Sequence, residues 1–312
     1  MITDTDKGNI GAELKRIVGD EKVYENEPMR DHTTFKIGGE ADFLVTPETI
    51  EQVTELLKFF KESETAFFFM GNGSNLLVSD DGFRGVAVKL LDDFAGVTFD
   101  GEDDKGMHFT AKAGTRMWRL GMFLLEHEAT GFEFGTGIPG TVGGAVMMNA
   151  GAYGGEMKDV VESVLVADRD GNVKRLSNEE MDFSYRHSAV SDNGYIVLEA
   201  VLCLKKGDKQ EIRAGIDALT EKRRTKQPLD MPSAGSTFKR PEGYYAAQLI
   251  DEAGFRGRTV GGAAVSEKHA GFVINKGGAT AEDVVALTDE IKKVVMERTG
   301  VELELEVRKI GF

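Results

Sequence analysis

Glycine is concentrated in one stretch of this chain. Nine of the 25 residues from 131 to 155 are glycine, and the whole chain carries 38 glycines but only 6 prolines among 312 residues. Glycine makes up about 12% of the chain, against a usual share of about 7%. Because each glycine costs roughly 0.5–1 kcal/mol relative to alanine in regular elements, this density favours close backbone contact with a ligand over a flexible linker. A flat or phosphorylated ligand fits the pattern.

Length and charge narrow the class of protein. A chain of 312 residues with 41% hydrophobic and 29% charged residues is typical of a globular protein with two or three domains. The net charge of −15 argues against a nucleic-acid binder, which needs clustered lysine and arginine. The first twenty residues carry charges throughout and no apolar signal segment, so we expect a cytoplasmic protein without a membrane partner.

Cysteine and histidine usage predicts neither a disulfide nor a metal site. Cys203 is the only cysteine, and it lies in an apolar run typical of a buried strand. The five histidines never fall at metal-ligand spacing, so we expect no metal.

The hydrophobic pattern predicts a mixture of helices and strands, with an α/β unit near the start of the chain. Apolar residues at helical spacing predict helices over about 11–18, 49–62, 116–129, 212–227, 245–253 and 281–299. Short apolar or alternating runs predict strands over 34–37, 41–45, 66–70, 76–78, 86–90, 96–99, 107–111, 160–168, 173–176, 195–204, 271–275 and 301–308.

Two glycine-rich motifs are candidates for cofactor binding. The segment 71–75, Gly-Asn-Gly-Ser-Asn, follows an apolar strand and can present backbone N–H groups to a diphosphate. It has neither the third glycine of a dinucleotide fingerprint nor the Lys-Ser/Thr pair of a P-loop, so a hairpin turn is an alternative. The segment 135–145 is long enough to wrap a ligand with backbone alone, although turns between strands have a similar composition.

Three further positions could be catalytic, but each also has a purely structural interpretation. Arg186 follows Tyr185 in a polar segment, where an arginine is usually solvated. Ser236 lies among small residues, which also suits a turn or a helix cap. Glu306 ends a series of alternating acids that is typical of the exposed face of a strand.

Taken in order, six motifs resemble those of the UDP-N-acetylenolpyruvoylglucosamine reductase family, flavoproteins of peptidoglycan synthesis. The motifs are Thr34-Phe35-Lys36-Ile37-Gly38-Gly39, Gly71-Asn72-Gly73-Ser74-Asn75, Gly137-Ile138-Pro139-Gly140-Thr141-Val142-Gly143-Gly144, Tyr185-Arg186, Gly235-Ser236-Thr237-Phe238-Lys239 and Glu306-Val307-Arg308. The resemblance spans nearly the whole chain. Arg186 and Ser236 are only 236 − 186 = 50 positions apart, which resembles the shorter subgroup of the family.

The resemblance implies an α+β fold. It consists of a two-domain FAD-binding fold of the vanillyl-alcohol-oxidase/PCMH (p-cresol methylhydroxylase) type and a C-terminal α+β substrate-binding domain. We expect the two FAD-binding subdomains over 1–91 and 92–208 and the substrate-binding domain over 209–300. The resemblance also implies that a C-terminal strand within 301–312 returns to the flavin site.

The resemblance further implies the reaction and its site residues. NADPH reduces FAD, which then passes hydride to UDP-N-acetylglucosamine enolpyruvate and so yields UDP-N-acetylmuramate. By resemblance, Arg186 stabilises charge on the substrate carboxylate, Glu306 orients or protonates the developing enolate, and Ser236 delivers a proton to carbon. The residues implied to bind FAD are Gly71, Asn72, Gly73, Ser74, Asn75, Gly137, Ile138, Pro139, Gly140, Thr141, Gly143 and Gly144. The candidate cations for the diphosphate of the substrate are Lys226, Lys239 and Arg240.

Two other functions compete with this interpretation. One is an FAD-dependent oxidase of the same superfamily that acts on another substrate. The other is a non-catalytic nucleotide-sugar binding protein with a degenerate flavin site. The sequence does not predict the oligomeric state.

Overall fold

The chain passes several times between two structural units. The structure, a computed structural model, describes residues 4–312, with side chains from residue 7 onward. Unit 1 contains the chain up to Glu25 together with Phe43–Asn72 and Gly85–Glu221, and unit 2 contains Asn26–Asp42, Gly73–Arg84 and Lys222–Phe312. The first glycine motif is therefore divided, with its first two residues in unit 1 and its last three in unit 2.

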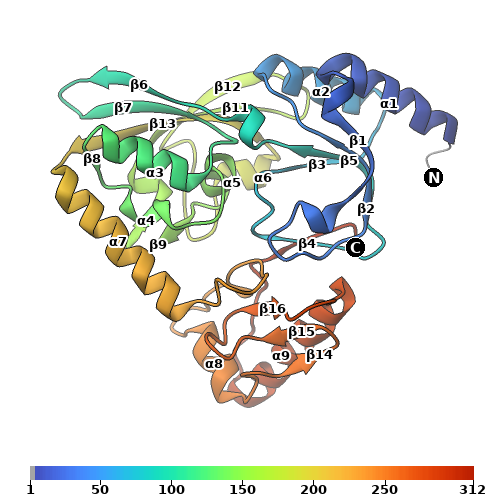
Figure 1. Cartoon of the computed structure of the whole chain (residues 1–312), viewed down its shortest axis with the longest axis vertical. Helices are drawn as coiled ribbons and strands as arrows, with labels where there is room; N and C mark the ends of the chain where they lie inside the picture. Colours follow the sequence, from blue (N-terminus) through green and yellow to red (C-terminus); the bar gives the residue numbers. More distant parts are fainter. Residues whose placement is uncertain (1–3) are drawn as a thin grey trace. The chain divides into compact units, whose positions relative to one another are not determined.

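A six-stranded antiparallel sheet dominates unit 1 (Figure 1). Its strands follow the order β12-β11-β13-β7-β6, and β8 pairs with the end of β13. The strands are β6 (Val97–Glu102), β7 (Met107–Lys112), β8 (Ala129–Thr130), β11 (Val161–Ala167), β12 (Val173–Ser177) and β13 (Ile196–Lys206). β13 lies at the centre and buries alternate apolar side chains, which explains its long apolar run.

A second sheet has the strand order β1-β2-β5-β3, and the division between the units passes through three of its strands. The strands are β1 (Val23–Pro28), β2 (Glu40–Val45), β3 (Phe67–Met70) and β5 (Phe83–Lys89). α1 (Asp4–Val18) packs on α2 (Ile50–Glu62) in unit 1. The hydroxyl of Thr49 accepts the N–H of Gln52 and caps α2, whose apolar stripe is buried.

Helices and turns of different lengths precede, connect or follow the strands of unit 1. They are η1 (Asp20–Lys22), η3 (Asp92–Phe94), α3 (Met117–Glu126), α4 (Glu133–Thr136), α5 (Val142–Met147), the hairpin β9 (Gly151–Ala152) and β10 (Gly155–Glu156), η4 (Met157–Asp159), α6 (Ala189–Asn193) and α7 (Lys209–Lys226), whose last turn belongs to unit 2. α5 packs against β13 and β7, and so the second glycine motif is fixed on the central strands of the large sheet.

Unit 2 is built around two helices and a three-stranded antiparallel sheet of order β14-β15-β16. Its elements are η2 (Met29–Asp31), β4 (Leu76–Val78), α8 (Ala246–Glu252), β14 (Thr259–Val260), β15 (Ala263–Val265), β16 (Val273–Asn275), α9 (Ala281–Thr299) and β17 (Arg308–Ile310). α9 begins with a capping box between Thr280 and Asp283 and ends at Gly300, whose φ of 71° is left-handed. Its buried Leu287 and Ile291 each stabilise the unit by about 1.5–3 kcal/mol.

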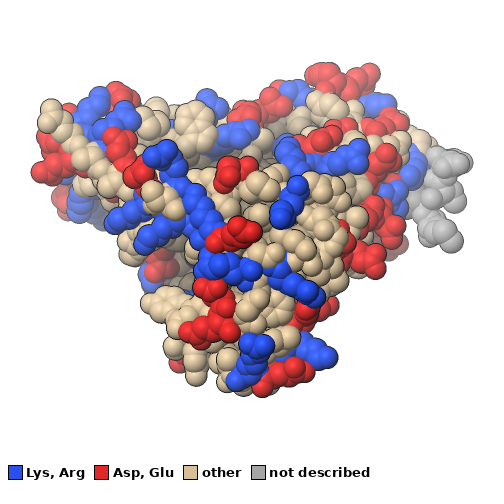
Figure 2. Space-filling view, turned by 60° about the horizontal axis from the view of Figure 1, so that its bottom comes forward, with Lys and Arg blue, Asp and Glu red and all other residues tan. Residues whose placement is uncertain are grey.

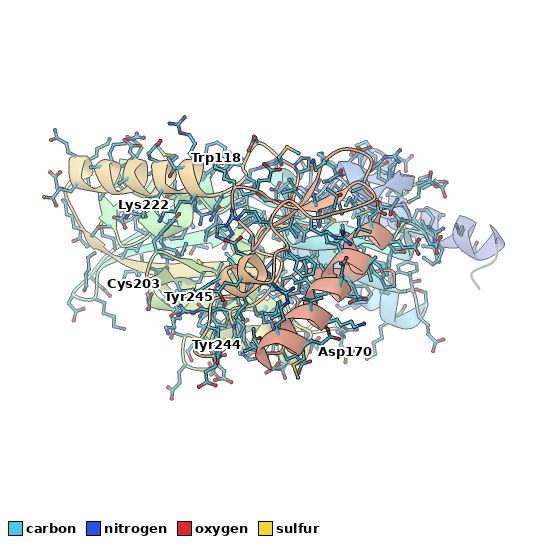
Figure 3. All side chains as sticks on the ribbon, turned by 90° about the horizontal axis from the view of Figure 1, so that it is seen from below. Trp118, Asp170, Cys203, Lys222, Tyr244 and Tyr245 are labelled. Atoms are coloured by element: carbon cyan, nitrogen blue, oxygen red, sulfur yellow. The ribbon has the colours of Figure 1, made fainter. Side chains whose placement is uncertain are left out.

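Most predicted helices and strands are confirmed, as is the mixed α+β class. The predicted helix over 281–299 has the observed bounds of α9, and the predicted helix over 49–62 differs from α2 only in its capping residue. Cys203 lies in β13 as predicted (Figure 3), but it is half-buried where the sequence predicted full burial.

Two predicted strands are wrong. Residues 34–37 form a turn because Lys36 has a φ of 57°, which a strand does not allow. The apolar side chains of Phe35 and Ile37 are buried in the core of unit 2, and this burial produced the strand-like pattern. Within 301–307, only Leu305 makes a strand bridge, and the regular strand β17 starts at Arg308, the last residue of the predicted range.

Candidate active site

The first glycine motif forms the loop between β3 and β4. Gly73 has a φ of 63°, a left-handed conformation that glycine adopts without strain. Within the part of the chain that the structure describes, the backbone N–H groups of residues 71 to 74 donate to no protein acceptor. Consecutive N–H groups can bind the oxygens of a diphosphate. The loop therefore has the donors that the predicted diphosphate site requires.

Asn72 connects the first glycine motif to the second. Its Nδ2 donates to the backbone oxygen of Pro139 at 2.7 Å, and its Oδ1 accepts from Nη1 of Arg116 at 3.1 Å. Beside it, Gly71 packs so closely on Thr141 that a Cβ at position 71 would overlap the buried hydroxyl. Glycine at this position is what lets the two motifs meet.

The second glycine motif runs from the end of α4 into α5. The N–H of Val142 donates to the oxygen of Thr115 at 2.9 Å, and the N–H of Gly143 donates to the oxygen of Ala113 at 2.8 Å. These bonds fix the start of α5 on the segment that follows β7. Because the N–H of Gly143 is already bonded to Ala113, it cannot donate to a ligand.

Arg116 supports the junction of the two motifs, although no sequence pattern predicted this role. Its guanidinium binds both oxygens of Asp92, at 3.2 Å from Nε and 2.9 Å from Nη2, in addition to its bond to Asn72. The hydrogen bonds from Arg116 lower the pKa of Asp92. In the sequence, Arg116 is a single arginine before an apolar helix, and nothing there indicates these contacts.

The predicted catalytic Arg186 occupies a strained two-residue turn in unit 1. Ser184 and His187 exchange backbone hydrogen bonds of 3.2 Å on either side of the turn, and Arg186 has a φ of 55°. This is the third position of a type II-like turn, where glycine is usual, and a non-glycine residue there costs about 1–3 kcal/mol. The guanidinium lies 5.1 Å from the ring centre of Tyr185.

A second basic group lies next to Arg186. Nε2 of His187 is 2.9 Å from the carboxylate of Asp192, and this hydrogen bond raises the pKa of the histidine. Protonated His187 would add positive charge beside Arg186 over a wider pH range than a solvated histidine does.

Ser236 and Glu306 lie in paired segments of unit 2. The N–H of Glu306 donates to the oxygen of Thr237 at 2.9 Å, and Phe238 forms a strand bridge with Leu305. Nδ2 of Asn75, from the first glycine motif, donates to the backbone oxygen of Glu306 at 3.0 Å. Three motifs that are far apart in the sequence thus form one hydrogen-bonded group in unit 2.

The motif that begins at Thr34 joins the same group. The N–H of Thr34 donates to the oxygen of Gly73 at 3.3 Å, and its hydroxyl donates to the oxygen of Ser233 at 2.7 Å. Nδ2 of Asn275 donates to the oxygen of Phe35 at 3.2 Å. The turn that includes residues 34–37, which were predicted as a strand, therefore connects the glycine loop to the serine motif.

The three candidate cations differ in their surroundings. Lys239 is half-buried, and its ammonium group is paired with Glu304. Arg240 lies 4.1 Å from the ring centre of Tyr245 and donates to the oxygen of Tyr244; both tyrosines are exposed (Figure 3). Lys226 is exposed at the last position of α7. Lys239 is thus the candidate that a neighbouring carboxylate orients.

Basic and acidic side chains are mixed on the surface of the molecule. Figure 2 shows lysine and arginine interspersed with aspartate and glutamate on the displayed face, so a net charge of −15 does not prevent local basic sites.

Over residues 4–312, no cluster of histidine, cysteine, aspartate and glutamate has metal-site geometry. None of the helices in that range has the length and apolar character that crossing a bilayer requires.

Two protein families match different parts of the chain. Residues 41–177 match the family described as "FAD binding domain". Residues 227–310 match the family described as "UDP-N-acetylenolpyruvoylglucosamine reductase, C-terminal domain". The first match includes both glycine motifs, and the second includes the serine motif and Glu306.

Named relatives match this chain over nearly its full length and over nearly their own full length. The UDP-N-acetylenolpyruvoylglucosamine reductase of Caldanaerobacter subterraneus subsp. tengcongensis is 50% identical over 298 residues, which is 96% of this chain and 97% of the relative. That of Clostridioides difficile is 49% identical over 97% of this chain and 98% of its own. The crystal structure of UDP-N-acetylenolpyruvylglucosamine reductase (MurB) from Thermus caldophilus has a TM-score of 0.75 at 37% identity, and it covers 91% of this chain and 97% of its own.

Proposed function

The chain belongs to the UDP-N-acetylenolpyruvoylglucosamine reductase family, and we infer from this membership that it reduces UDP-N-acetylglucosamine enolpyruvate to UDP-N-acetylmuramate in peptidoglycan synthesis. The observation that carries this function is 50% identity over 96% of the chain with a reductase of that name. The two family matches, over 41–177 and 227–310, include both glycine motifs, the serine motif and Glu306.

FAD is the resident cofactor and NADPH the reductant. When bound, FAD would supply the methylene carbon of the enolpyruvyl group with the hydride that NADPH provides. Residues 71–75 fit its diphosphate because four consecutive N–H groups there have no protein acceptor within the described range, and because Gly71 lets the loop pack directly on Thr141. The protein contributes orientation and exclusion of water.

Three side chains carry the proposed chemistry. As hydride reaches the methylene carbon, negative charge develops on the enolpyruvyl carboxylate, and the planar fork of Arg186 can bind that carboxylate through two N–H groups. Glu306 orients or protonates the developing enolate. Ser236 delivers the proton to the carbon that bears the carboxylate, so that the double bond gains one hydride and one proton.

Residues 209–300 form the proposed substrate-binding domain, and the family match over 227–310 supports this assignment. We also propose a cytoplasmic location, because NADPH and nucleotide sugars are cytoplasmic metabolites. Recovery of the native protein in the membrane fraction of lysed cells would contradict that location.

The purified protein should be yellow, and anaerobic NADPH should bleach its flavin absorbance. Addition of UDP-N-acetylglucosamine enolpyruvate should then restore the absorbance faster than oxygen does. Fast reoxidation by oxygen with no response to the enolpyruvyl nucleotide would instead identify an oxidase. A colourless protein that still binds the nucleotide and gains no absorbance on incubation with FAD would identify a non-catalytic binder.

Lys239→Ala should raise the KM for the enolpyruvyl nucleotide about 10-fold, because a hydrogen bond between a cation and a phosphate contributes about 1.5 kcal/mol. Lys226→Ala should have a smaller effect, since the exposed side chain of Lys226 has no ion-pair partner among the side chains of residues 7–312 that would orient it. Steady-state kinetics at saturating NADPH measures both constants. Lys276→Ala, which removes another exposed lysine of unit 2, is the control. An unchanged KM in Lys239→Ala would exclude Lys239 from the diphosphate site.

A further inference from the structure

Asn149 is a buried polar residue that the sequence analysis did not single out. Its side chain is 1% exposed, and it follows α5 with a backbone φ of 41°. Oδ1 accepts the N–H of Lys158 at 2.9 Å, and Nδ2 donates to Oε2 of Glu156 at 2.6 Å and to the backbone oxygen of Ser184 at 3.0 Å. These three bonds use both ends of the amide, and so they fix its orientation.

The third bond of Asn149 reaches the turn that carries Arg186. Ser184 is the residue that closes this turn with His187, and Arg186 occupies the left-handed position within it. The turn has two arms: the residues up to Ser184 precede it, and the residues from His187 onward follow it. On the following arm, the hydroxyl of the fully buried Ser188 donates to the backbone oxygen of Met147 at 2.7 Å. Both arms of the turn are thus held by residues at the end of α5.

The strain of the turn makes these anchors necessary. A non-glycine residue keeps a left-handed conformation only where its surroundings determine it. The 3.2 Å hydrogen bonds between Ser184 and His187 are long for backbone bonds, so this pair alone stabilises the conformation of the turn only weakly. The bond from Asn149 to Ser184 adds a rigid, buried contact on the arm that precedes Arg186.

We propose that Asn149 is a positioning residue for Arg186: its amide holds the arm at Ser184 and thereby aims the guanidinium at the carboxylate of the enolpyruvyl substrate. This inference rests on the proposed function of Arg186. Since α5 begins within the second glycine motif, the same helix links the predicted flavin loop to the arginine turn. A small displacement of the turn would weaken bidentate binding of a planar carboxylate.

The substitution Asn149→Gly tests the proposal most cleanly. Glycine tolerates a φ of 41°, and so the variant removes the amide while leaving the backbone conformation accessible. We expect unchanged FAD content and unchanged reduction by NADPH, with reoxidation by the enolpyruvyl nucleotide slowed by about 10- to 100-fold. Asn149→Ser is the second variant, to be used if Asn149→Gly does not fold.

A double-mutant cycle separates positioning from general stability. In an Arg186→Ala background, removal of the Asn149 amide should change the reoxidation rate by less than about 2-fold, because the amide acts through Arg186. Asn178→Ala is the matched control, since its Nδ2 also donates to two backbone oxygens of unit 1, those of Lys158 and Val161, but does not contact the turn. It should leave reoxidation unchanged.

Two results would overturn the proposal. One is a similar loss of rate from Asn149→Gly in the wild-type and Arg186→Ala backgrounds. The other is a normal reoxidation rate in a folded Asn149→Gly variant that has its full FAD content. If Arg186→Ala itself left reoxidation unchanged, the proposed role of Arg186 would fail, and the cycle would reveal this through the single Arg186 variant.

Discussion

Ser236→Ala is expected to leave the reduction of flavin by NADPH intact and to slow its reoxidation by UDP-N-acetylglucosamine enolpyruvate by about 10²- to 10⁴-fold, the usual contribution of a general acid. Hydride transfer from NADPH to flavin needs no proton from this side chain, whereas reduction of the enolpyruvyl double bond does. Anaerobic stopped-flow absorbance measures the two half-reactions separately.

The surroundings of Ser236 make alanine a clean replacement. The adjacent Thr237 is fixed by three bonds: its N–H donates to Gly271, its hydroxyl accepts from Val273, and its oxygen accepts from Glu306. Loss of one hydroxyl from Ser236 leaves all of these bonds in place, so the segment should keep its conformation.

Two variants serve as controls for the serine. Ser233→Ala removes a hydroxyl from the same motif while keeping the backbone oxygen that binds Thr34, and it should react normally. Ser236→Cys keeps a proton donor with a lower intrinsic pKa, near 8.5 for a cysteine, and should recover most of the lost rate. Equal slowing of both half-reactions in Ser236→Ala would contradict its role as the proton donor.

Local patterns predicted the regular parts of the fold. α2 and α9 have apolar stripes at helical spacing and capping residues at their first turns, so their bounds were close to the prediction. The strand predictions failed where apolar side chains are buried although their backbone does not pair with another strand. Phe35 and Ile37 are buried from a turn, and the C-terminal alternation of acids has only one bridging partner, at Leu305. An apolar pattern records burial, and it does not record which backbone groups pair.

From the sequence, a candidate site could be proposed only where it consists of contiguous motifs. The glycine loops and the segments around Ser236 and Glu306 are recognisable because neighbouring residues act together. Asn149 and Arg116 act across long sequence separations, through bonds to Ser184 and Asn72. A single buried asparagine or a single arginine has no distinctive pattern, and so its role emerges only from tertiary contacts.

Arg186→Ala is expected to slow reoxidation of reduced flavin by the enolpyruvyl nucleotide by about 10²- to 10³-fold, the usual effect of removing one donor that stabilises a developing negative charge. The reduction of flavin by NADPH should not change. Arg186→Lys should recover only part of the rate, because an ammonium group cannot bind a carboxylate through a planar fork. Arg175→Ala, which removes another arginine from unit 1, is the charge-matched control.

The left-handed backbone at position 186 allows loss of charge to be separated from loss of the turn. Arg186→Gly removes the guanidinium and accepts a φ of 55° without strain, whereas Arg186→Ala retains the strain. If the guanidinium itself is required, both variants should lose the same rate, and added guanidinium ion should partly restore Arg186→Gly. If Arg186→Gly were as active as the wild type, the defect of Arg186→Ala would lie in the conformation of the turn, and electrostatic stabilisation by Arg186 would be excluded.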